Sequence, residues 1–493
     1  MISTLPGNFP GSKSPYLMAK KNQNPHLNPD TFRDALASVR DDGKRNWVYP
    51  KKVKGFFFRY RTYFSWILLA ILFAGPFIKI DGRPYMLFNI FERKFIIFGA
   101  VFWPQDTILL IFLLLILFVF VILFTVVFGR VWCGWACPQT LFMEMVFRKI
   151  EYLIEGDANQ QRALNDAPWT GDKIWKKGLK YSIFTFFSLL IGHLVMAYLI
   201  GVDQVVEIVT QPPAANMAGF VGLLAFSGIF LFVFAWFREQ ACIVVCPYGR
   251  LQGVLLDNNS INVMYDYVRG EPRAPIRKNV VEEAPKGDCV DCGLCVQVCP
   301  TGIDIRNGTQ MECVNCTACI DACDEVMVKV DRPTGLIRYA SENSVTGGVQ
   351  KLFTGRVKGF SVVLLVLLGA FITLIATRDE LAGTITRFPG MTYQEREAGK
   401  VSNLYNITLI NKSFESQRVE IAALAEGMEV EIVGAKEWVL EPQTKFEGRF
   451  FLVRTQAEVK VPQEKVILQL LSHGEEFDEI QTNFMAPVGV TNQ

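Results

Sequence analysis

The sequence predicts a polytopic α-helical membrane protein with a cysteine-rich domain between two of its spans and a small β-sandwich at its C-terminus. Three observations predict this architecture. Of the 493 residues, 51% are hydrophobic and only 20% are charged, and the apolar residues fall in long blocks. All 12 cysteines lie between Cys133 and Cys323, and the pattern changes from apolar blocks to alternation after about Gly399. This composition excludes an ordinary soluble enzyme, a disordered protein and a small disulfide scaffold.

Five segments are predicted to cross the membrane, since a helix needs about 20 mostly apolar residues to span a bilayer. They are Tyr63–Ile78, Ile108–Phe128, Tyr181–Ile200, Met217–Phe237 and Phe360–Ala376. The aromatic segment Tyr85–Trp103 contains charged residues, and we expect it to lie at the membrane interface rather than to form a sixth crossing. No cleavable signal is visible before the first span, so we expect that span to act as an uncleaved anchor.

Basic residues predict the orientation, because cytoplasmic loops carry an excess of Lys and Arg. Such residues number eight in 40–61, seven in 130–178 and fourteen in 238–358, whereas 201–216 has none. The tail holds 18 Asp and Glu against 11 Lys and Arg. We therefore expect the N-terminus and the cysteine-rich loop on the cytoplasmic side and the tail outside. The expected parts are a flexible cytoplasmic segment 1–56, a four-helix membrane domain 57–260, a cytoplasmic cysteine-rich domain 261–357, a fifth transmembrane helix 358–378 and an external domain 379–493.

The cysteine-rich loop contains two copies of the spacing C-x2-C-x2-C-x3-C. In this spacing three thiolates hold one [4Fe-4S] cluster and the fourth reaches the other cluster. The first ligand set is then Cys289, Cys292, Cys295 and Cys323, and the second is Cys299, Cys313, Cys316 and Cys319. Zinc sites need only four ligands in paired knuckles, and disulfides are disfavoured in a cytoplasmic loop. The loop therefore predicts a two-cluster ferredoxin domain that transfers single electrons. Pro300 follows the first run, whereas Asp324 stands at the matching position after the second run.

The other four cysteines repeat a shorter pattern just after two of the spans. They stand in Cys133-Gly-Trp-Ala-Cys137-Pro138 and in Cys242-Ile-Val-Val-Cys246-Pro247, each preceded by an arginine, Arg130 or Arg238. On a continuing helix, thiols at i and i+4 share one face, and we expect the proline to end or bend the helix just beyond. The repetition predicts a duplicated unit in which all four thiols meet at the cytoplasmic boundary.

Four convergent thiolates are soft ligands that suit Cu(I), zinc or another iron–sulfur centre. A dithiol pair could instead cycle through a disulfide. The plain alternative is that these cysteines only pack, because free cysteine behaves as a small hydrophobe. We favour a redox or metal-binding role, because the spacing, the proline and the topology all repeat.

His193 lies near the middle of the third span, and a histidine inside a span is a functional candidate. A bis-histidine haem is not expected, because the chain has only two other histidines, His26 and His473. A hydrogen bond within the bundle, a proton transfer and a quinone contact stay open for His193. Neighbouring aromatic residues such as Phe184 are expected to pack or to anchor the interface.

The tail is predicted to form β-strands, because apolar and polar residues alternate there. The expected strands are Val401–Asn411, Val419–Ala423, Val430–Val433, Phe450–Val453 and Val466–Leu471. Gly, Pro and Asn residues separate them, as in a small β-sandwich. The tail shows no ligand cluster, so its acidity marks either a docking surface or an ordinary solvated surface.

Several motifs resemble the FixG/RdxA/CcoG family of cytochrome c oxidase accessory proteins. The motifs are Phe102-Trp-Pro-Gln-Asp106, Phe128-Gly-Arg-Val-Trp-Cys133 continuing to Thr140, Arg238 to Arg250, the double ferredoxin run, and Tyr405-Asn-Ile-Thr-Leu-Ile-Asn-Lys412. The resemblance runs from roughly Pro50 to the end of the chain. It implies a bacterial inner-membrane polyferredoxin with a periplasmic, immunoglobulin-like C-terminal domain.

The resemblance also implies a function, namely the reduction of Cu(II) to Cu(I) in support of assembly of the cbb3-type oxidase. We expect copper, as substrate or transient ligand, at the thiols of Cys133, Cys137, Cys242 and Cys246, which makes the protein a metal-ion oxidoreductase. The implied partners are the oxidase assembly machinery and copper donor and acceptor proteins, in addition to the lipid bilayer. No nucleic-acid partner is expected, and a homo-oligomer is left open. The alternatives are a quinol-linked electron-transfer subunit that feeds another reductase and a non-catalytic assembly factor.

Overall fold

The computed structural model describes residues 38–39, 44–80, 83–90, 94–97, 100–103, 106–276, 286–413, 415–434, 438–459, 461–472 and 474–487. Most of the expected flexible segment 1–56 lies outside these residues, as do His26 and His473. The chain divides into two compact units. We call Met1–Gly99 with Ile111–Leu367 the membrane–ferredoxin unit, and Ala100–Leu110 with Leu368–Gln493 the sandwich unit.

Five helices of the described residues are long and apolar enough to cross a membrane, as the sequence predicted. They are α3 (Phe56–Ala74) with the 3-10 turn η1 (Gly75–Phe77), α4 (Thr107–Phe128), α9 (Gly171–Ile200), α11 (Met217–Phe232) with the π-helix η4 (Val233–Phe237), and α17 (Gly355–Ala376). Three of them begin at least five residues earlier than predicted, namely α3 at Phe56, α9 at Gly171 and α17 at Gly355. The hydroxyl of Thr170 caps α9 by accepting the Lys173 N–H, and Lys177 and Lys180 then both pair with Glu155. These ion pairs explain how a helix with so many charges in its first turns packs against the unit.

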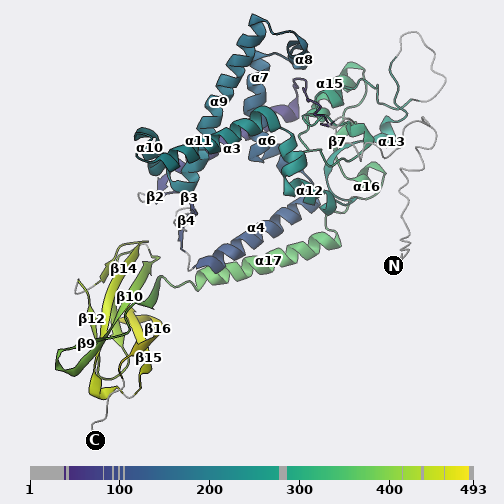
Figure 1. Ribbon diagram of the computed structural model, residues 1–493. Coiled ribbons are helices and arrows are strands. Elements are labelled where there is room, and N and C mark those ends of the chain that lie inside the picture. Colours follow the sequence, from purple (N-terminus) through teal and green to yellow (C-terminus); the bar gives the residue numbers. More distant parts are fainter. Residues whose placement is uncertain are drawn as a thin grey trace, which may run out of the picture. The chain divides into compact units, whose positions relative to one another are not determined.

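Aromatic rings form the core of the helical part of the membrane–ferredoxin unit. Phe147 stacks on Phe234 with 4.5 Å between ring centroids and meets the edge of Phe184 at 4.8 Å. All three rings are buried, so Phe184 has the packing role that the sequence indicated. Helices α9 and α11 lie side by side around this core (Figure 1).

Short elements connect the spans. The segment predicted to lie at the interface contains the antiparallel pair β3–β4 and then β5, so it forms no sixth helix, and its position relative to a membrane stays a prediction. The short elements up to the end of α12 are β1 (Lys79–Ile80), β2 (Arg83–Pro84), β3 (Met86–Asn89), β4 (Lys94–Ile97), β5 (Ala100–Phe102), α5 (Val131–Trp135), α6 (Pro138–Leu141), the π-helix η3 (Phe142–Phe147), α7 (Arg148–Ile154), α8 (Ala158–Asp166), α10 (Val202–Thr210), the π-helix η5 (Ala241–Val245) and α12 (Pro247–Leu255).

The cysteine-rich domain folds around a two-stranded antiparallel sheet in which β6 pairs with β7. Its elements gather in one part of the unit (Figure 1). They are β6 (Asn262–Tyr265), α13 (Tyr267–Gly270), α14 (Leu294–Gln297), the 3-10 turn η6 (Ile305–Asn307), α15 (Ala318–Lys329), β7 (Ile337–Ala340) and α16 (Glu342–Val345). Helix α15 continues past Cys323 because Asp324 stands where a proline would end it, and the Asp324 carboxylate accepts the Gly335 N–H at 2.8 Å.

The tail forms the predicted β-sandwich, with antiparallel sheets in the orders β12-β14-β10-β8 and β13-β11-β15-β16. The ring of Tyr405 stacks on Phe450 in its core. The strands are β8 (Leu381–Arg387), β9 (Gln394–Arg396), which pairs with β10, β10 (Lys400–Asn411), β11 (Gln417–Ala423), β12 (Met428–Ile432), β13 (Trp438–Leu440), β14 (Lys445–Thr455), β15 (Gln463–Ser472) and β16 (Glu475–Met485). The sequence missed β8, β9, β13 and β16, of which β9 and β13 have only three residues each and β16 is rich in charged residues.

Asp106 ties the loop before α4 to the sandwich within the sandwich unit. Its side chain is 4% exposed and accepts hydrogen bonds from Arg378 Nη2 at 2.6 Å and from Lys412 Nζ at 2.9 Å. Burial raises the pKa of Asp106, but the hydrogen bonds and charges of Lys412 and Arg378 outweigh it and hold the pKa below its ordinary value. Two motifs that the sequence singled out separately, one ending at Asp106 and one at Lys412, therefore meet in one buried ion cluster.

Candidate iron–sulfur and thiol sites

Each predicted cluster ligand set lines its own cavity in the cysteine-rich domain. One cavity is lined by Cys289, Cys292, Cys295 and Cys323. A second cavity is lined by Cys299, Cys313, Cys316 and Cys319, with Cys295 in the wall between the two. The chain thus brings together the four thiols that the spacing assigned to each cluster, and each cavity lined by soft thiol donors fits a [4Fe-4S] group.

The two cysteine runs fold in the same way, residue for residue. Asp291 and Asn315, each placed just before the second cysteine of its run, have φ values of 50° and 52°. Gly293 and Thr317, each just after that cysteine, both have φ values of 65° and begin α14 and α15. When residues of left-handed conformation alternate with residues of right-handed conformation, the loop curls around a concave site and its N–H groups turn inward. The repeat in sequence is therefore also a repeat in backbone shape.

Two buried arginines supply positive charge to the second cavity. Arg130 lies near Cys313, and Arg61 lies near Cys316. Burial raises the pKa of the Cys313 thiol to about 12 and that of Cys316 to about 11, while these two guanidinium groups act in the opposite direction. The arginines therefore favour the thiolate form that iron requires. In the sequence Arg61 counted only among the basic residues before the predicted first span, whereas the structure places it inside α3.

The second cysteine of each thiol motif sits at a helix break, which corrects the expectation that both thiols lie on one continuing helix, whereas Cys133 and Cys242 lie inside α5 and η5. Cys137 and Cys246 have extended backbone, with ψ values of 124° and 111°. Pro138 and Pro247 are the first residues of new helices, α6 and α12. Proline is favourable at this position, because the N–H that it lacks would have no partner within the helix. Each proline starts a helix instead of ending one, so the second cysteine of each motif points from a sharp corner of the chain.

The two motifs are true repeats in backbone shape, although the matching positions differ from those that the sequence suggested. Gly129 and Arg238, each four residues before the first cysteine of its motif, have φ values of 55° and 53°. Arg238 thus corresponds to Gly129 and not to Arg130. An arginine with a left-handed backbone conformation is strained. Strong contacts of the Arg238 side chain are therefore needed to hold the backbone in this conformation.

Hydrogen bonds that cross between the two repeats fix these arginines, and one of them is also an ion pair. Arg238, from the second motif, donates to both carboxylate oxygens of Glu151 in α7, at 3.1 and 2.9 Å. Arg130, from the first motif, donates to the side chain of Gln252 and to Gly249 O in α12. Each arginine therefore holds the helix segment that follows the other motif, which draws the two motifs together.

The four thiols are close enough to influence one another. Burial, together with the nearby thiols of Cys137, Cys133 and Cys246, raises the pKa of Cys242 to about 12. Burial also raises the pKa of Cys133, whose Sγ lies 3.5 Å from Gln252 Oε1. In the part of the chain that the structure describes, no three Cys, His, Asp or Glu side chains converge tightly enough for a single metal ion. The ferredoxin cysteines share this wider spacing.

The first thiol motif packs directly on the loop of the second cluster. A methyl group placed at Gly134 would lie 2.4 Å from Val314 O and 2.8 Å from Asn315 O, so only glycine permits this approach. The carbonyl of Gly134 accepts from Arg61 Nε at 2.7 Å. Since Val314 and Asn315 lie between two ligands of the second cluster, the thiol site and that cluster site are in van der Waals contact.

Hydrogen bonds reinforce the same contact. Trp135 Nε1 donates to the Tyr339 hydroxyl at 3.0 Å, and that hydroxyl donates to Asn315 O at 3.3 Å. Asn315 Oδ1 in turn accepts the Val263 N–H at 3.2 Å. The residues between the cysteines of the first motif, which the sequence left without a role, are therefore the docking surface for the ferredoxin domain.

Substitution of Gly134 by alanine tests this contact. We expect Gly134→Ala to destabilise the protein by about 1–3 kcal/mol, since the loop must move away from the new methyl group. The change should lower the Tm of the cluster-loaded protein and alter the EPR signal of one cluster. Gly222→Ala is the matched control, because a methyl group there meets no atom within 4 Å. Equal effects of both substitutions would contradict the proposed contact.

His193 satisfies a local hydrogen bond. Its Nδ1 lies 2.6 Å from Leu189 O, one turn earlier in α9. This hydrogen bond is one of the three roles that the sequence left open for His193. Proton transfer and a quinone contact stay predictions.

Three family models match the chain. A 4Fe-4S dicluster domain matches residues 237–342, and a model of the immunoglobulin-like fold at the C-terminus of FixG matches residues 371–487. A 4Fe-4S binding domain matches residues 110–154, a range that contains Cys133 and Cys137 and none of the ferredoxin cysteines. An iron–sulfur centre therefore stays among the open assignments for the thiol site.

Similar proteins cover most of the chain. Protein RdxA of Cereibacter sphaeroides is 37% identical over 404 residues, which are 77% of this chain and 82% of RdxA. Nitrogen fixation protein FixG of Rhizobium meliloti is 32% identical over 427 residues, 78% of this chain and 80% of FixG. Protein RdxB of Cereibacter sphaeroides is 32% identical over 414 residues, 81% of this chain and 85% of RdxB.

Proposed function

Since the chain belongs to the FixG/RdxA family of iron–sulfur membrane proteins, we propose that it is an electron-transfer protein that reduces Cu(II) to Cu(I). The thiols of Cys133, Cys137, Cys242 and Cys246 are the copper site in this proposal. The observation that carries it is the contact of Gly134 with the loop between Cys313 and Cys316. It joins a set of soft ligands to a cluster site without intervening solvent.

The chemistry of the chain's own residues supports this role. When bound, a [4Fe-4S] cluster supplies one electron at a time with little rearrangement, and Cu(II) needs one electron to become Cu(I). Thiolates prefer the softer Cu(I), so the four thiols stabilise the product. Because burial keeps Cys242 protonated at neutral pH, copper must displace its proton on binding. The cation of Arg130, which acts to lower the pKa of Cys133, offsets part of the negative charge that results.

We place this activity at a bacterial inner membrane, with the ferredoxin domain in the cytoplasm and the sandwich in the periplasm. The distribution of basic residues supports this orientation. The reduced copper would serve assembly of a cbb3-type cytochrome c oxidase, with copper donor and acceptor proteins as partners. These roles rest on the family.

One observation favours a second candidate, an electron-transfer subunit that feeds another reductase. The 4Fe-4S binding model over residues 110–154 includes half of the thiol site. A third iron–sulfur centre at the four thiols would make the site a relay for electrons rather than a copper site.

An anaerobic titration tests the proposal. Purified, cluster-loaded protein is reduced, freed of excess reductant and titrated with Cu(II), while Cu(I) is measured with a chromogenic chelator. We expect one Cu(I) for each electron lost from the clusters, followed through their visible absorbance, and copper retained by the protein in a parallel titration without the chelator. The oxidised protein is the control and should form no Cu(I). Iron bound by the four thiols together with absence of copper reduction would favour the relay and overturn the copper assignment.

A further inference from the structure

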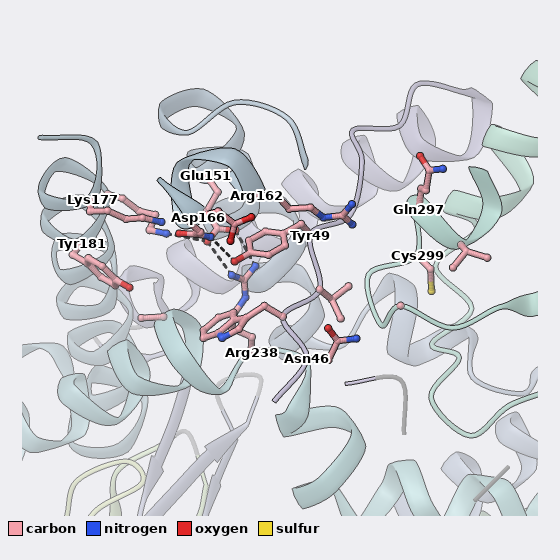
Figure 2. A pocket seen from close by; sticks show the side chains of 17 residues that line it. Asn46, Tyr49, Glu151, Arg162, Asp166, Lys177, Tyr181, Arg238, Gln297 and Cys299 are labelled. Atoms are coloured by element: carbon pink, nitrogen blue, oxygen red, sulfur yellow. Dashed lines mark hydrogen bonds and ion pairs between the residues drawn. The ribbon is translucent and has the colours of Figure 1, made fainter. Parts of the chain in front are cut away.

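A large cavity in the membrane–ferredoxin unit lies apart from the thiol site. Its volume is about 700 Å³, which is within the range of pockets that hold small molecules and cofactors. Its walls come from the segment Asn46–Tyr49, from α8, from the start of α9, and from the cysteine loop. Figure 2 shows Lys177 and Tyr181 on one side of it, Gln297 and Cys299 on the other, and Arg238 with Glu151 between them.

One wall of this cavity is a cluster ligand. Cys299 lines the large cavity and also lines the cavity of the second ferredoxin ligand set. Cys299 accordingly borders both spaces. A molecule in the large cavity would therefore contact the second cluster site, on a different wall from the thiol site, which approaches through Val314 and Asn315.

The lining carries an excess of positive charge. Four cations line it against two carboxylates: Arg162, Lys177, Lys180 and Arg238 against Glu151 and Asp166. Three of these cations are neutralised by buried carboxylates, since Arg238 pairs with Glu151 and both lysines pair with Glu155. Arg162 is exposed and, among the described residues, has no ion-pair partner, so it is available for an anionic ligand.

Aromatic side chains complete the lining. Trp47, Tyr49 and Tyr181 all face the cavity. Trp47 is partly exposed, and Arg45 and Arg238 lie over its ring at 3.9 and 5.8 Å. Arg238 itself is held in a strained left-handed conformation and is 4% exposed. A fixed cation beside aromatic faces suits a planar ligand that also carries negative charge.

These features narrow the class of ligand. A neutral quinol would leave Arg162 unpaired, and a nicotinamide passes its two electrons together as hydride, which a one-electron centre cannot accept. A reduced flavin nucleotide is planar, carries a phosphate and releases its electrons singly. We propose that this cavity binds a flavin mononucleotide, with the phosphate at Arg162 and the ring among the aromatic residues, as the electron donor beside Cys299.

The reaction balances with the two predicted clusters. Reduced flavin loses two electrons in two single steps, one electron for each cluster, and its two protons leave to water at the open side of the cavity, where Asp166 is exposed. The inference rests on the electron-transfer part of the proposed function and not on copper. Flavin binding without copper reduction would mean that the copper proposal fails and the flavin proposal holds. Copper reduction without flavin binding would mean that the flavin proposal fails and the copper proposal holds.

Binding to the full, cluster-loaded chain in neutral-lipid nanodiscs tests the inference. Quenching of flavin mononucleotide fluorescence gives the affinity, and riboflavin, which lacks the phosphate, is measured alongside. We expect Arg162→Glu to weaken mononucleotide binding roughly tenfold, because it removes a charge-assisted contact and adds repulsion, and to leave riboflavin binding unchanged. Trp47→Leu should weaken both ligands. Arg356→Glu is the matched control, because Arg356 is also exposed and without a described partner but does not line the cavity.

A second readout follows the reaction itself. Anaerobic mixing with reduced flavin mononucleotide should bleach the cluster absorbance in the parent protein and in Arg356→Glu, and more slowly in Arg162→Glu. The proposal is overturned if mononucleotide and riboflavin bind equally, or if Arg162→Glu and Arg356→Glu behave alike. Displacement of the flavin by inorganic phosphate or by anionic lipid at equal concentration would also overturn it, since the cavity would then be an anion or headgroup site.

Discussion

Replacing Cys133, Cys137, Cys242 and Cys246 with serine is expected to lower the rate of Cu(II) reduction by at least roughly a hundredfold. Loss of a residue that only supports a metal ligand typically costs 10–100-fold, and here the ligands themselves are lost. A serine hydroxyl is a hard donor that holds Cu(I) poorly. The measurement is Cu(I) formation by the reduced, cluster-loaded variant, as in the titration above.

The state of the clusters is the control for this variant. Iron and sulfide content and the cluster absorbance should stay at the level of the parent protein, because the eight ferredoxin cysteines line separate cavities. Copper reduction that survives in the fourfold variant would show that the thiols are not the copper site. A fall in iron and sulfide content would show instead that the four thiols hold a third iron–sulfur centre.

Asp106→Asn is expected to produce the largest loss of stability, about 3–5 kcal/mol, confined to the sandwich unit. The substitution removes the negative charge that Lys412 and Arg378 share, and leaves two poorly hydrated cations without a counter-ion. Hydrogen exchange of the full chain should show faster exchange in the strands β8 and β10, near Arg378 and Lys412, and little change in the ferredoxin domain. Asp379→Asn is the matched control, because that carboxylate is exposed and has no described partner.

The same carboxylate predicts an acid-dependent loss of stability. The native pKa of Asp106 lies below its ordinary value of 3.8, so its contribution is complete above about pH 4 and is lost as the pH falls through the native pKa. The parent sandwich should therefore lose stability more steeply below pH 4 than Asp106→Asn, which carries no titrating group at this position. Parallel pH profiles for the two proteins would contradict the ion cluster.

Patterns that depend on neighbouring residues were readable from the sequence. The spans, the tail strands β10, β11, β12, β14 and β15, and both ferredoxin ligand sets follow from local hydropathy, alternation or cysteine spacing. The sequence showed that the two thiol motifs are repeats, but it did not predict their backbone conformation. Cys137 and Cys246 end one helix and Pro138 and Pro247 begin another, a choice that depends on how the following segment packs.

The sequence by itself determined five helices apolar enough to cross a membrane, two cysteine runs with [4Fe-4S] spacing, a pair of repeated thiol motifs and a β-rich tail, because each of these is encoded at short range. Only the tertiary structure decided how they combine. Arg130 and Arg238 lock the two thiol motifs together, Gly134 admits the second cluster loop, and Asp106 joins Arg378 and Lys412. The partners in each case are more than 80 residues apart in the chain, and only packing brings such charges and surfaces into contact.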